Sequence, residues 1–164
     1  SGLVTDLAAA AKGAGQADWP ARVQKLKDGH LTQLASRTVW LDGAHNVHGA
    51  KALVASLSSL YPRKWIIVFG ALDTRPTEEF LSVIKPIAGR IYCLTIPNQP
   101  NALEASTLVS RARSLGLKAD TANDISSACR AIGKLGATDN QPVIICGSLY
   151  LAGGVLQANG TLPN

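Results

Sequence analysis

Residues 41–46 read LDGAHN and place a carboxylate, Asp42, three positions before an imidazole, His45. They follow the apolar stretch 38–40, so they lie where a strand is expected to end and a helix to begin. An aspartate at such a junction can bind ribose hydroxyls, because its carboxylate accepts two hydrogen bonds in a fork. A plain turn explains the same residues, since Asp and Gly favour turns and Asn46 is a good helix N-cap.

Polar side chains also follow the other apolar stretches of the chain. Asp73 and Arg75 follow residues 65–70, Asn98 and Asn101 follow 90–96, and Ser148 and Tyr150 follow 142–147. If these stretches are parallel strands, their carboxyl ends meet at one edge of a sheet and the polar groups converge there. Gly147 and Ser148 can present a hydroxyl and backbone N–H groups to a carboxylate or phosphate, or Ser148 can simply cap a helix.

The motifs of a complete phosphate-transfer enzyme are absent from the sequence. There is no G-x-x-x-x-G-K-[ST] loop, no dinucleotide-binding fingerprint and no G-x-S-x-G elbow. His45 and His48 form an H-x-x-H pair, but no Cys or Glu stands nearby in ligand register, so we expect no metal site in this chain. The chain by itself therefore lacks a complete apparatus for nucleotide hydrolysis.

The elements that must position these residues alternate along the chain. Continuous apolar blocks predict strands buried on both faces at 38–41, 65–70, 90–96 and 142–147, with a weaker candidate at 117–121. Helical patterns lie between them, at 46–60, 77–88, 103–115 and 123–135. Thr77 is expected to cap its helix, and His30 is expected on the surface in the turn-like stretch KDGHL. Alternating strands and helices predict an α/β fold, a three-layer sandwich with a mostly parallel sheet.

Length and composition fit one globular domain with a proper core, at 164 residues, 46% apolar and 16% charged. The net charge is +5, but the basic residues are scattered and only 5% of residues are aromatic. This pattern disfavours nucleic acid as a partner and suits anionic small molecules.

No apolar run approaches the roughly 20 residues that span a bilayer, so no membrane partner is expected. Three widely spaced cysteines fit no disulfide framework and indicate a reducing, cytoplasmic compartment.

Four motifs in order make the sequence recognisable: WPARVQ at 19–24, LDGAHN at 41–46, VFGALDTR at 68–75 and CGSLYLAG at 146–153. Together they resemble the C-terminal domain of folylpolyglutamate synthase/dihydrofolate synthase, within the Mur ligase group. The resemblance implies a Rossmann-like sheet that closes over a larger N-terminal ATPase domain carrying the phosphate loop and the metal site. Residues 17–164 are then the C-terminal domain, and residues 1–16 are the linker and the tail of the missing domain.

The resemblance implies a reaction in which ATP and Mg²⁺ convert a pteroate or folate carboxylate into an acyl phosphate. The amine of L-glutamate then attacks this intermediate. The isolated chain is expected to be inactive, because the phosphate loop would lie in the missing domain. Two alternatives stay open, a Mur-type peptidoglycan amino-acid ligase and a stand-alone nucleotide-binding regulatory module, since a fold does not fix a function. The sequence also leaves open whether the whole protein makes dihydrofolate, extends polyglutamate tails or does both.

The resemblance also implies roles for individual residues. Arg22 resembles the arginine that reaches the nucleotide and neutralises phosphate charge, and it is assigned to catalysis and nucleotide binding. Asp42 resembles the group that holds the ATP ribose. His45 resembles the histidine that organises the nucleotide and amino-acid sites, and it is assigned to catalysis and nucleotide binding. Arg75 and Ser148 are placed to bind the carboxylates of the incoming glutamate.

Three positions depart from the pattern of the family. Val47 follows LDGAHN where proline is usual, which costs little because proline is merely favoured at the first helical position. Arg75 stands where lysine is more frequent, so the charge is kept but its shape changes. Asn101 stands where relatives often carry arginine, and any ligand contact of that arginine would be missing here.

Overall fold

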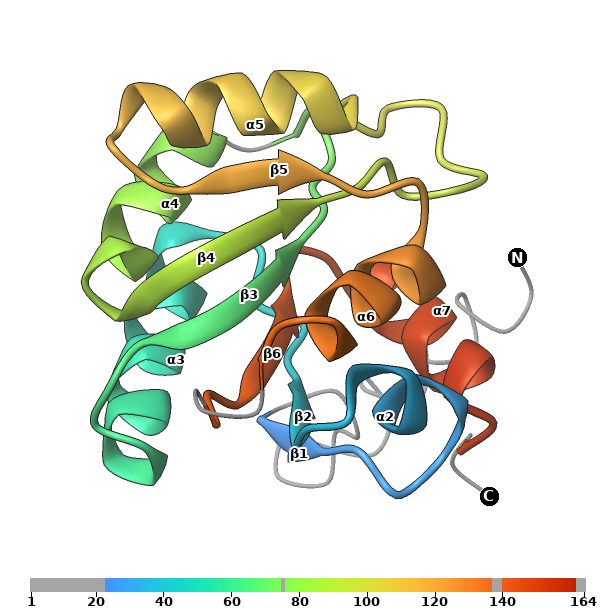
Figure 1. The fold of residues 1–164 in the computed structure, drawn as a ribbon. Helices are drawn as coiled ribbons and strands as arrows, with labels where there is room; N and C mark the ends of the chain where they lie inside the picture. Colours follow the sequence, from blue (N-terminus) through green and yellow to red (C-terminus); the bar gives the residue numbers. More distant parts are fainter. Residues whose placement is uncertain (1–22, 75, 137–139, 162–164) are drawn as a thin grey trace, which may run out of the picture.

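The computed structural model describes residues 23–74, 76–136 and 140–161, which form a sheet with helices on both faces (Figure 1). The strands are β1 (Gln24–Lys25), β2 (Val39–Leu41), β3 (Trp65–Phe69), β4 (Ala88–Cys93), β5 (Ala119–Thr121) and β6 (Val143–Cys146). The helices are α2 (His30–Ala35), α3 (Val47–Leu60), α4 (Thr77–Ile84), α5 (Ala105–Ser114), α6 (Ile125–Gly133) and α7 (Leu149–Asn159), with a 3₁₀ turn, η1 (Lys85–Ile87), after α4. No helix among these residues is long and apolar enough to cross a bilayer.

The strand order in the sheet is β1-β2-β6-β3-β4-β5. The strands β2, β6, β3, β4 and β5 are parallel, and only the edge pair β1–β2 is antiparallel. Three connections, through α3, α4 and α5, advance across the sheet in one direction, whereas the connection through α6 returns and inserts β6 beside β3. Because parallel crossovers share one hand, the returning helix must cover the opposite face of the sheet.

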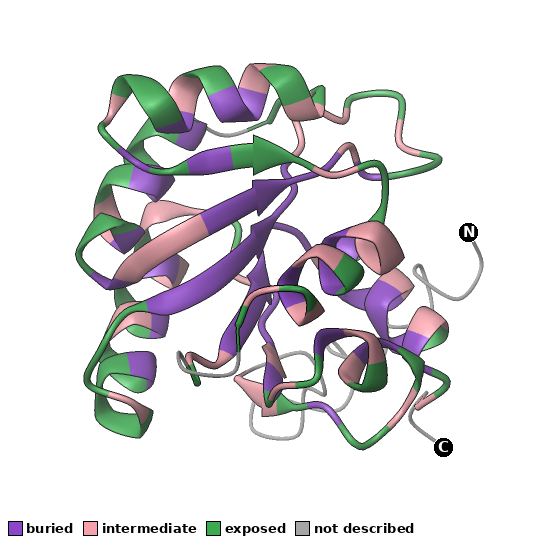
Figure 2. Cartoon of the chain, in the orientation of Figure 1, coloured by how far each residue is buried: buried purple, intermediate pink, exposed green. Residues whose placement is uncertain are grey.

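Apolar side chains from α3, α4 and α5 pack on one face of the sheet, and those from α2, α6 and α7 pack on the other. The strands in the middle of the sheet are buried on both faces, as Figure 2 shows. In β3, Ile66 and Val68 point into one core, while Trp65, Ile67 and Phe69 point into the other. Burying each such side chain contributes about 1.5–3 kcal/mol, which explains why these strands are continuous apolar blocks in the sequence.

The predicted three-layer α/β sandwich with a mostly parallel sheet is confirmed, and each expected strand and helix is present with ends shifted by a few residues. Two short elements were not predicted: β1, which pairs with β2 at the edge, and α2, which begins at the exposed His30. Of α7, only the start at Ser148 was anticipated. The expected cap of α4 was wrong. Pro76 occupies the N-cap position, and Thr77 is the first helical residue, with its hydroxyl bound to Arg111 instead.

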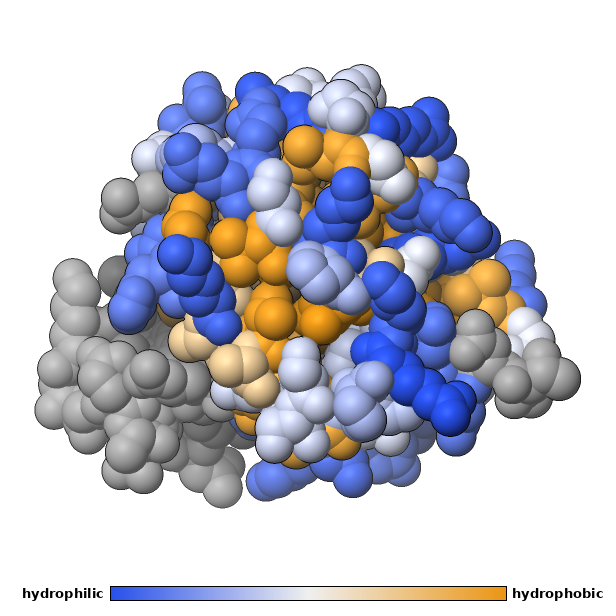
Figure 3. Space-filling model, turned by 90° about the vertical axis from the view of Figure 1, so that its left-hand side faces the viewer, coloured by the Kyte–Doolittle hydropathy of each residue, from blue (hydrophilic) through white to orange (hydrophobic). Residues whose placement is uncertain are grey.

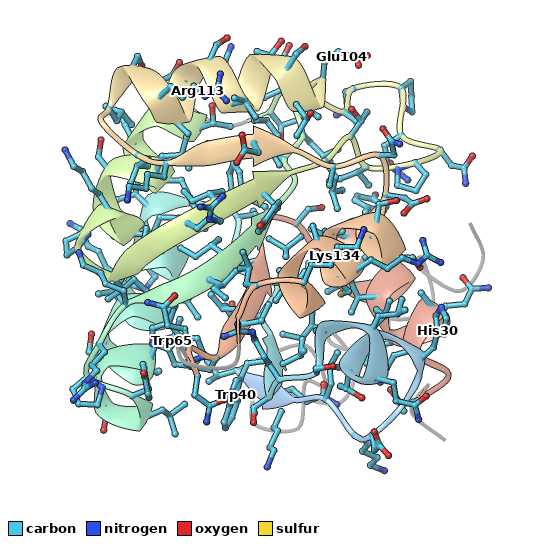
Figure 4. The ribbon with its side chains drawn as sticks, viewed as in Figure 1. His30, Trp40, Trp65, Glu104, Arg113 and Lys134 are labelled. Atoms are coloured by element: carbon cyan, nitrogen blue, oxygen red, sulfur yellow. The ribbon has the colours of Figure 1, made fainter. Side chains whose placement is uncertain are left out.

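Half-buried apolar side chains, among them Trp40, Val54 and Tyr61, lie near the amino ends of the strands, and Leu60 at the end of α3 is exposed. Figure 3 faces this edge, at the left of Figure 1, and shows an apolar patch ringed by hydrophilic side chains. A shallow groove at the edge is lined in part by Val54, Tyr61, Pro62, Pro86 and Ile87. Nearby, Trp40 and Trp65 meet edge to face, with ring centroids 6.5 Å apart (Figure 4). The predicted site residues belong to the opposite edge, where the parallel strands end.

Candidate functional site

A crevice of about 190 Å³ opens at the carboxyl ends of β3 and β6. These adjacent strands lead into helices on opposite faces of the sheet, α4 after β3 and α7 after β6, so their loops diverge. Ligands of open α/β sheets bind where strand connections diverge in this way. The lining of the crevice comprises His45, Phe69, Ala71, Leu72, Thr74, Pro76, Thr77, Phe80, Gly147, Ser148, Leu149 and Tyr150. The structure thus brings together in one crevice His45 and Ser148, two of the polar residues that were expected at this edge of the sheet.

Ser148 begins α7 and faces the crevice while being only 3% exposed. Its hydroxyl oxygen accepts a hydrogen bond from the Tyr150 N–H at 3.0 Å, so it is the N-cap of the helix. The hydroxyl hydrogen is still available to donate to a ligand. The cap interpretation of Ser148 is therefore confirmed. Its role toward a ligand stays a prediction that is compatible with the cap, because a cap that uses the oxygen as acceptor leaves the O–H as donor.

Gly147 makes the approach of β6 to β3 possible. Its φ of +119° belongs to the region that favours glycine, and a Cβ there would overlap the carbonyl oxygen of Gly70. Its own N–H donates to the carbonyl of Ala44 at 2.9 Å, which ties the end of β6 to the loop after β2. This close approach brings Ser148 to the loop that carries His45.

His45 is exposed at the rim of the crevice, just before α3. Its Nδ1 lies 3.1 Å from the carbonyl oxygen of Gly43. A carbonyl only accepts, so Nδ1 must carry the hydrogen, and Nε2 of the neutral ring is then an acceptor. The adjacent Asn46 caps α3 by accepting the Gly49 N–H at 2.8 Å, as the sequence predicted, and this fixes the loop that holds the imidazole.

Asp42 directly follows β2 and is 7% exposed. Its Oδ2 accepts the Val23 N–H at 2.8 Å, and its Oδ1 accepts the Ala44 N–H at 2.7 Å. The carboxylate therefore holds the loop before α3 and the start of the described chain. Asp42 also acts on the neighbouring strand β6. Burial raises the pKa of the Cys146 thiol, and the negative charge of the Asp42 carboxylate raises it further. Asp42 is a buried anion beside the site, not part of the lining of the crevice.

Arg22 and Arg75, the two cations predicted for the site, lie outside the described residues. The loop in which Arg75 occurs is anchored on its amino-terminal side by the loop after β4. There the Asp73 N–H donates to the Asn101 carbonyl at 2.7 Å, and the Leu103 N–H donates to the Ala71 carbonyl at 3.0 Å. Asn101 contributes to this rim through its backbone while its side chain is exposed.

The sequence did not indicate the apolar floor of the crevice. Phe69 and Phe80 stack below it with ring centroids 5.3 Å apart, and Tyr150 stands at the crevice, 39% exposed. Phe69 and Phe80 were recognised only as members of apolar patterns, and those patterns look the same for a core residue and for the floor of a pocket. Tyr150, in contrast, was among the polar residues that the sequence placed at this edge, and it does line the crevice.

The described residues offer no group of three or more His, Cys, Asp or Glu side chains placed to hold a metal ion. His45 and His48 share the start of α3, but no third ligand accompanies them in this part of the chain. The chemistry of the crevice is therefore that of hydroxyl, imidazole and helix N-terminal N–H groups, which suits anionic groups such as carboxylates.

Fold and crevice together define a class: an α/β domain with a parallel sheet whose ligand site lies where the strand connections reverse direction. Within that class, the chain belongs to the Mur ligase family, because the family model described as Mur ligase, glutamate ligase domain matches residues 22–149. This match confirms the family that the four motifs indicated.

Known relatives agree with this assignment. The folylpolyglutamate synthase of Lacticaseibacillus casei is 27% identical over 146 residues, which are 89% of this chain and 31% of that protein. A bifunctional folylpolyglutamate synthase/dihydrofolate synthase from Yersinia pestis, solved with AMPPNP and a Mn ion, is 25% identical with a TM-score of 0.71, over 87% of this chain and 32% of that chain.

The folylpolyglutamate synthase of Mycobacterium tuberculosis, solved with ADP, has the same fold, with a TM-score of 0.76 at 24% identity. The similarity covers 88% of this chain and 33% of that one. The chain therefore spans about a third of the length of the relatives that it matches.

Proposed function

We propose that this chain is the C-terminal domain of an ATP-dependent amide ligase that adds L-glutamate to dihydropteroate, to folylpolyglutamate or to both. The observation that carries the proposal is the crevice after β3 and β6, with Ser148 at the start of α7 and His45 at its rim, in a member of a glutamate ligase family. Residues 17–164 are the ligase domain in this proposal. Residues 1–16 are the linker and the end of a preceding ATPase domain.

The proposed reaction has two chemical steps. The γ-phosphoryl group of ATP is transferred to the carboxylate of the pteroate or folate, which gives an acyl phosphate and ADP. The amine nitrogen of glutamate then forms a bond to the acyl carbon while the bond from that carbon to the phosphate oxygen breaks. The nitrogen loses one proton, which leaves with the inorganic phosphate.

The glutamate side of the site is proposed to consist of Ser148, Arg75 and the positive end of α7. The Ser148 O–H donates to a substrate carboxylate, and the helix N-terminus favours the negative charge. Arg75 adds a charge-assisted, fork-shaped pair of donors for a second carboxylate oxygen pair. The crevice has the dimensions of a small molecule, which suits an amino acid better than a whole folate.

The nucleotide side is proposed to consist of Asp42, Arg22 and His45. Asp42 lies at the end of β2, where the Val23 and Ala44 N–H groups hold its carboxylate in place, and a carboxylate is the acceptor that suits the two hydroxyls of a ribose. Arg22 neutralises the charge of the transferring phosphoryl group. His45 lies between the two sides, and the carbonyl of Gly43 fixes its ring with Nε2 as the acceptor.

Magnesium does not fit the described residues, which form no metal-binding group, so we propose that the preceding domain holds it. The structure solved with AMPPNP and a Mn ion supports the use of a nucleotide and a divalent metal by the whole protein. Three free, buried thiols support a reducing, cytoplasmic compartment. A peptidoglycan ligase is less well supported, because the matched relatives are folylpolyglutamate synthases.

The experiment that tests the proposal is steady-state kinetics on the longer protein that includes this domain. Ser148→Ala and Arg75→Ala should raise KM for glutamate, because they remove donors to its carboxylates. Asp42→Ala and Arg22→Ala should instead impair the use of ATP. Losing one charge-assisted contact is worth about 1.5–3 kcal/mol, or about ten- to a hundredfold in kcat/KM.

Each pair of variants serves as the control for the other, since the two pairs address different substrates. Wild-type kinetics in all four variants would contradict the proposed site. A collapse of ATP use in Ser148→Ala with an unchanged KM for glutamate would show that the two sides are reversed. A genuine start codon at Ser1, with no ATPase domain upstream in the coding sequence, would favour the regulatory module instead.

A further inference from the structure

The first turn of α4 forms one wall of the crevice and is held from outside by α5. Pro76, Thr77 and Phe80 all line the crevice. Pro76 is the N-cap residue, but no side chain caps the helix there. The position of this wall therefore depends on contacts other than a local cap.

Arg111 of α5 supplies such a contact. Its Nη1 donates to the Thr77 hydroxyl at 2.8 Å, and its Nε lies 3.1 Å from Oε1 of Glu78. Thr77 is 3% exposed and the Arg111 side chain is 31% exposed, whereas Glu78 is 51% exposed. The hydroxyl end of the bond to Thr77 is buried, so water screens this bond less than the ion pair with the exposed Glu78, and we expect it to contribute more.

The residues just before α5 also hold the beginning of the loop between β3 and α4. The backbone bonds from Asp73 to Asn101 and from Leu103 to Ala71 attach the loop after β3 to residues just before α5. The bond from Arg111 to Thr77 attaches the start of α4 to α5 itself. In the sequence, Arg75 stands between these two anchors.

We propose that Arg111 is a positioning residue for the amino-acid side of the crevice. By holding Thr77, it fixes the wall of the crevice that Pro76, Thr77 and Phe80 form. Arg111 does not touch the substrate, so its effect is on how well the preformed crevice fits glutamate. This inference rests on the proposed function, because it concerns the same crevice.

The test uses the longer ligase with the variants Thr77→Val, Arg111→Met, Arg111→Lys and Glu78→Gln. Thr77→Val keeps the shape of the side chain and removes the hydroxyl that accepts from Arg111. Arg111→Met removes the donor and keeps most of the aliphatic packing. Glu78→Gln is the matched control, because it removes the charge of the exposed partner and leaves the bond to Thr77 in place.

Thr77→Val and Arg111→Met should each raise KM for glutamate about tenfold, the size expected for one lost hydrogen bond to a charged group. The KM for ATP and kcat should stay within about twofold of wild type, because the nucleotide side does not use this wall. Arg111→Lys should recover part of the loss, since an ammonium can still donate to the hydroxyl. Glu78→Gln should resemble wild type. Thermal melting of each variant verifies that it is folded.

Two results would overturn the inference while leaving the proposed function intact. One is an unchanged KM for glutamate in folded Thr77→Val and Arg111→Met while Ser148→Ala raises it. The other is an equal fall in kcat and in the use of both substrates, which indicates general loosening. If Ser148→Ala and Arg75→Ala also leave glutamate use unchanged, the proposed function fails and this inference fails with it.

Discussion

At the scale of single residues, the site depends on places where the backbone permits only one residue type. Gly147 has a positive φ and lies directly against Gly70, which lets the loops after β6 and β3 approach each other. Ser148 and His45 meet at the crevice because of this approach. Gly147 thus shapes the site through its backbone, although it has no side chain to offer a ligand.

Gly147→Ala should lower the free energy of unfolding by about 2–4 kcal/mol, because it combines backbone strain with overlap at Gly70. Gly154 in α7 is a matched control, since a Cβ there meets nothing within 4 Å. Gly154→Ala should raise the free energy of unfolding by about 0.5–1 kcal/mol, because alanine is the better helix former. Urea unfolding of the isolated chain measures both. Equal stability of the two variants would contradict this account of Gly147.

At the scale of elements, helix caps determine where the loops at the carboxyl edge end. Asn46 caps α3, Ser148 caps α7, and Asp124 caps α6 by accepting the Ser127 N–H at 2.7 Å. Each cap satisfies a backbone donor that the helix leaves without a partner. Because each helix begins a few residues after a strand ends, a cap also fixes the loop that follows the strand.

The cap of α6 should make stability depend on pH. The N–H and side chain of Ser127 lower the pKa of Asp124 below its ordinary value of 3.8. A lowered pKa in the folded state means that the carboxylate stabilises the fold above pH 3.8, and that this contribution is lost as the pH falls below it. Asp124→Ala should cost about 1 kcal/mol at pH 7 and progressively less as the pH falls below 3.8.

Asp124→Asn is the control, since its amide oxygen still caps the helix but does not titrate. Urea unfolding at pH 7 and at pH 3 compares wild type with both variants. A cost of Asp124→Ala that is the same at both values would show that the charge of Asp124 contributes nothing to the cap.

At the scale of the whole molecule, stability comes from two apolar cores separated by the sheet. Cys129 belongs to the core under α2, α6 and α7, whereas Cys93 and Cys146 belong to the core under α3, α4 and α5. All three are free and buried. Burial raises the pKa of Cys129 to about 12, and burial together with the Asp120 charge does the same for Cys93. The reaction of each thiol with an alkylating reagent therefore measures whether its core has opened to solvent.

The thiols should not react with iodoacetamide at pH 8 in the folded chain, and all three should react in urea. Because the folded pKa of Cys129 is about 12 and its ordinary value is 9.0, its contribution to stability is complete below pH 9 and is lost between pH 9 and 12. The unfolding midpoint should fall over this range and fall less in Cys129→Ala, whose overall stability is lower. Rapid labelling of folded wild type at pH 8 would contradict the buried positions.

Much of the fold was predictable because burial leaves a direct mark on the sequence. Strands with apolar residues on both faces read as continuous blocks, as β3 and β6 do, and helices between them read at three- and four-residue steps. The elements β1 and α2 show no such pattern in the sequence, because β1 has two residues and α2 has six, which is less than two helical turns. Such elements are stabilised by their neighbours, here β2 and the buried Asn159 of α7.

The sequence by itself determined the fold class, the family motifs and the residue types at each strand end, because these depend on local pattern and on chemistry. Only the tertiary structure decided which of those residues meet. The insertion of β6 between β2 and β3 brings Ser148 beside His45 and makes the crevice, although 103 positions separate them in the numbering. The packing of α5 against α4 likewise brings Arg111 to the Thr77 hydroxyl, so Thr77 does not serve as the cap of α4. Strand order and helix packing are set by the sum of many long-range contacts, and no short stretch of sequence records that sum.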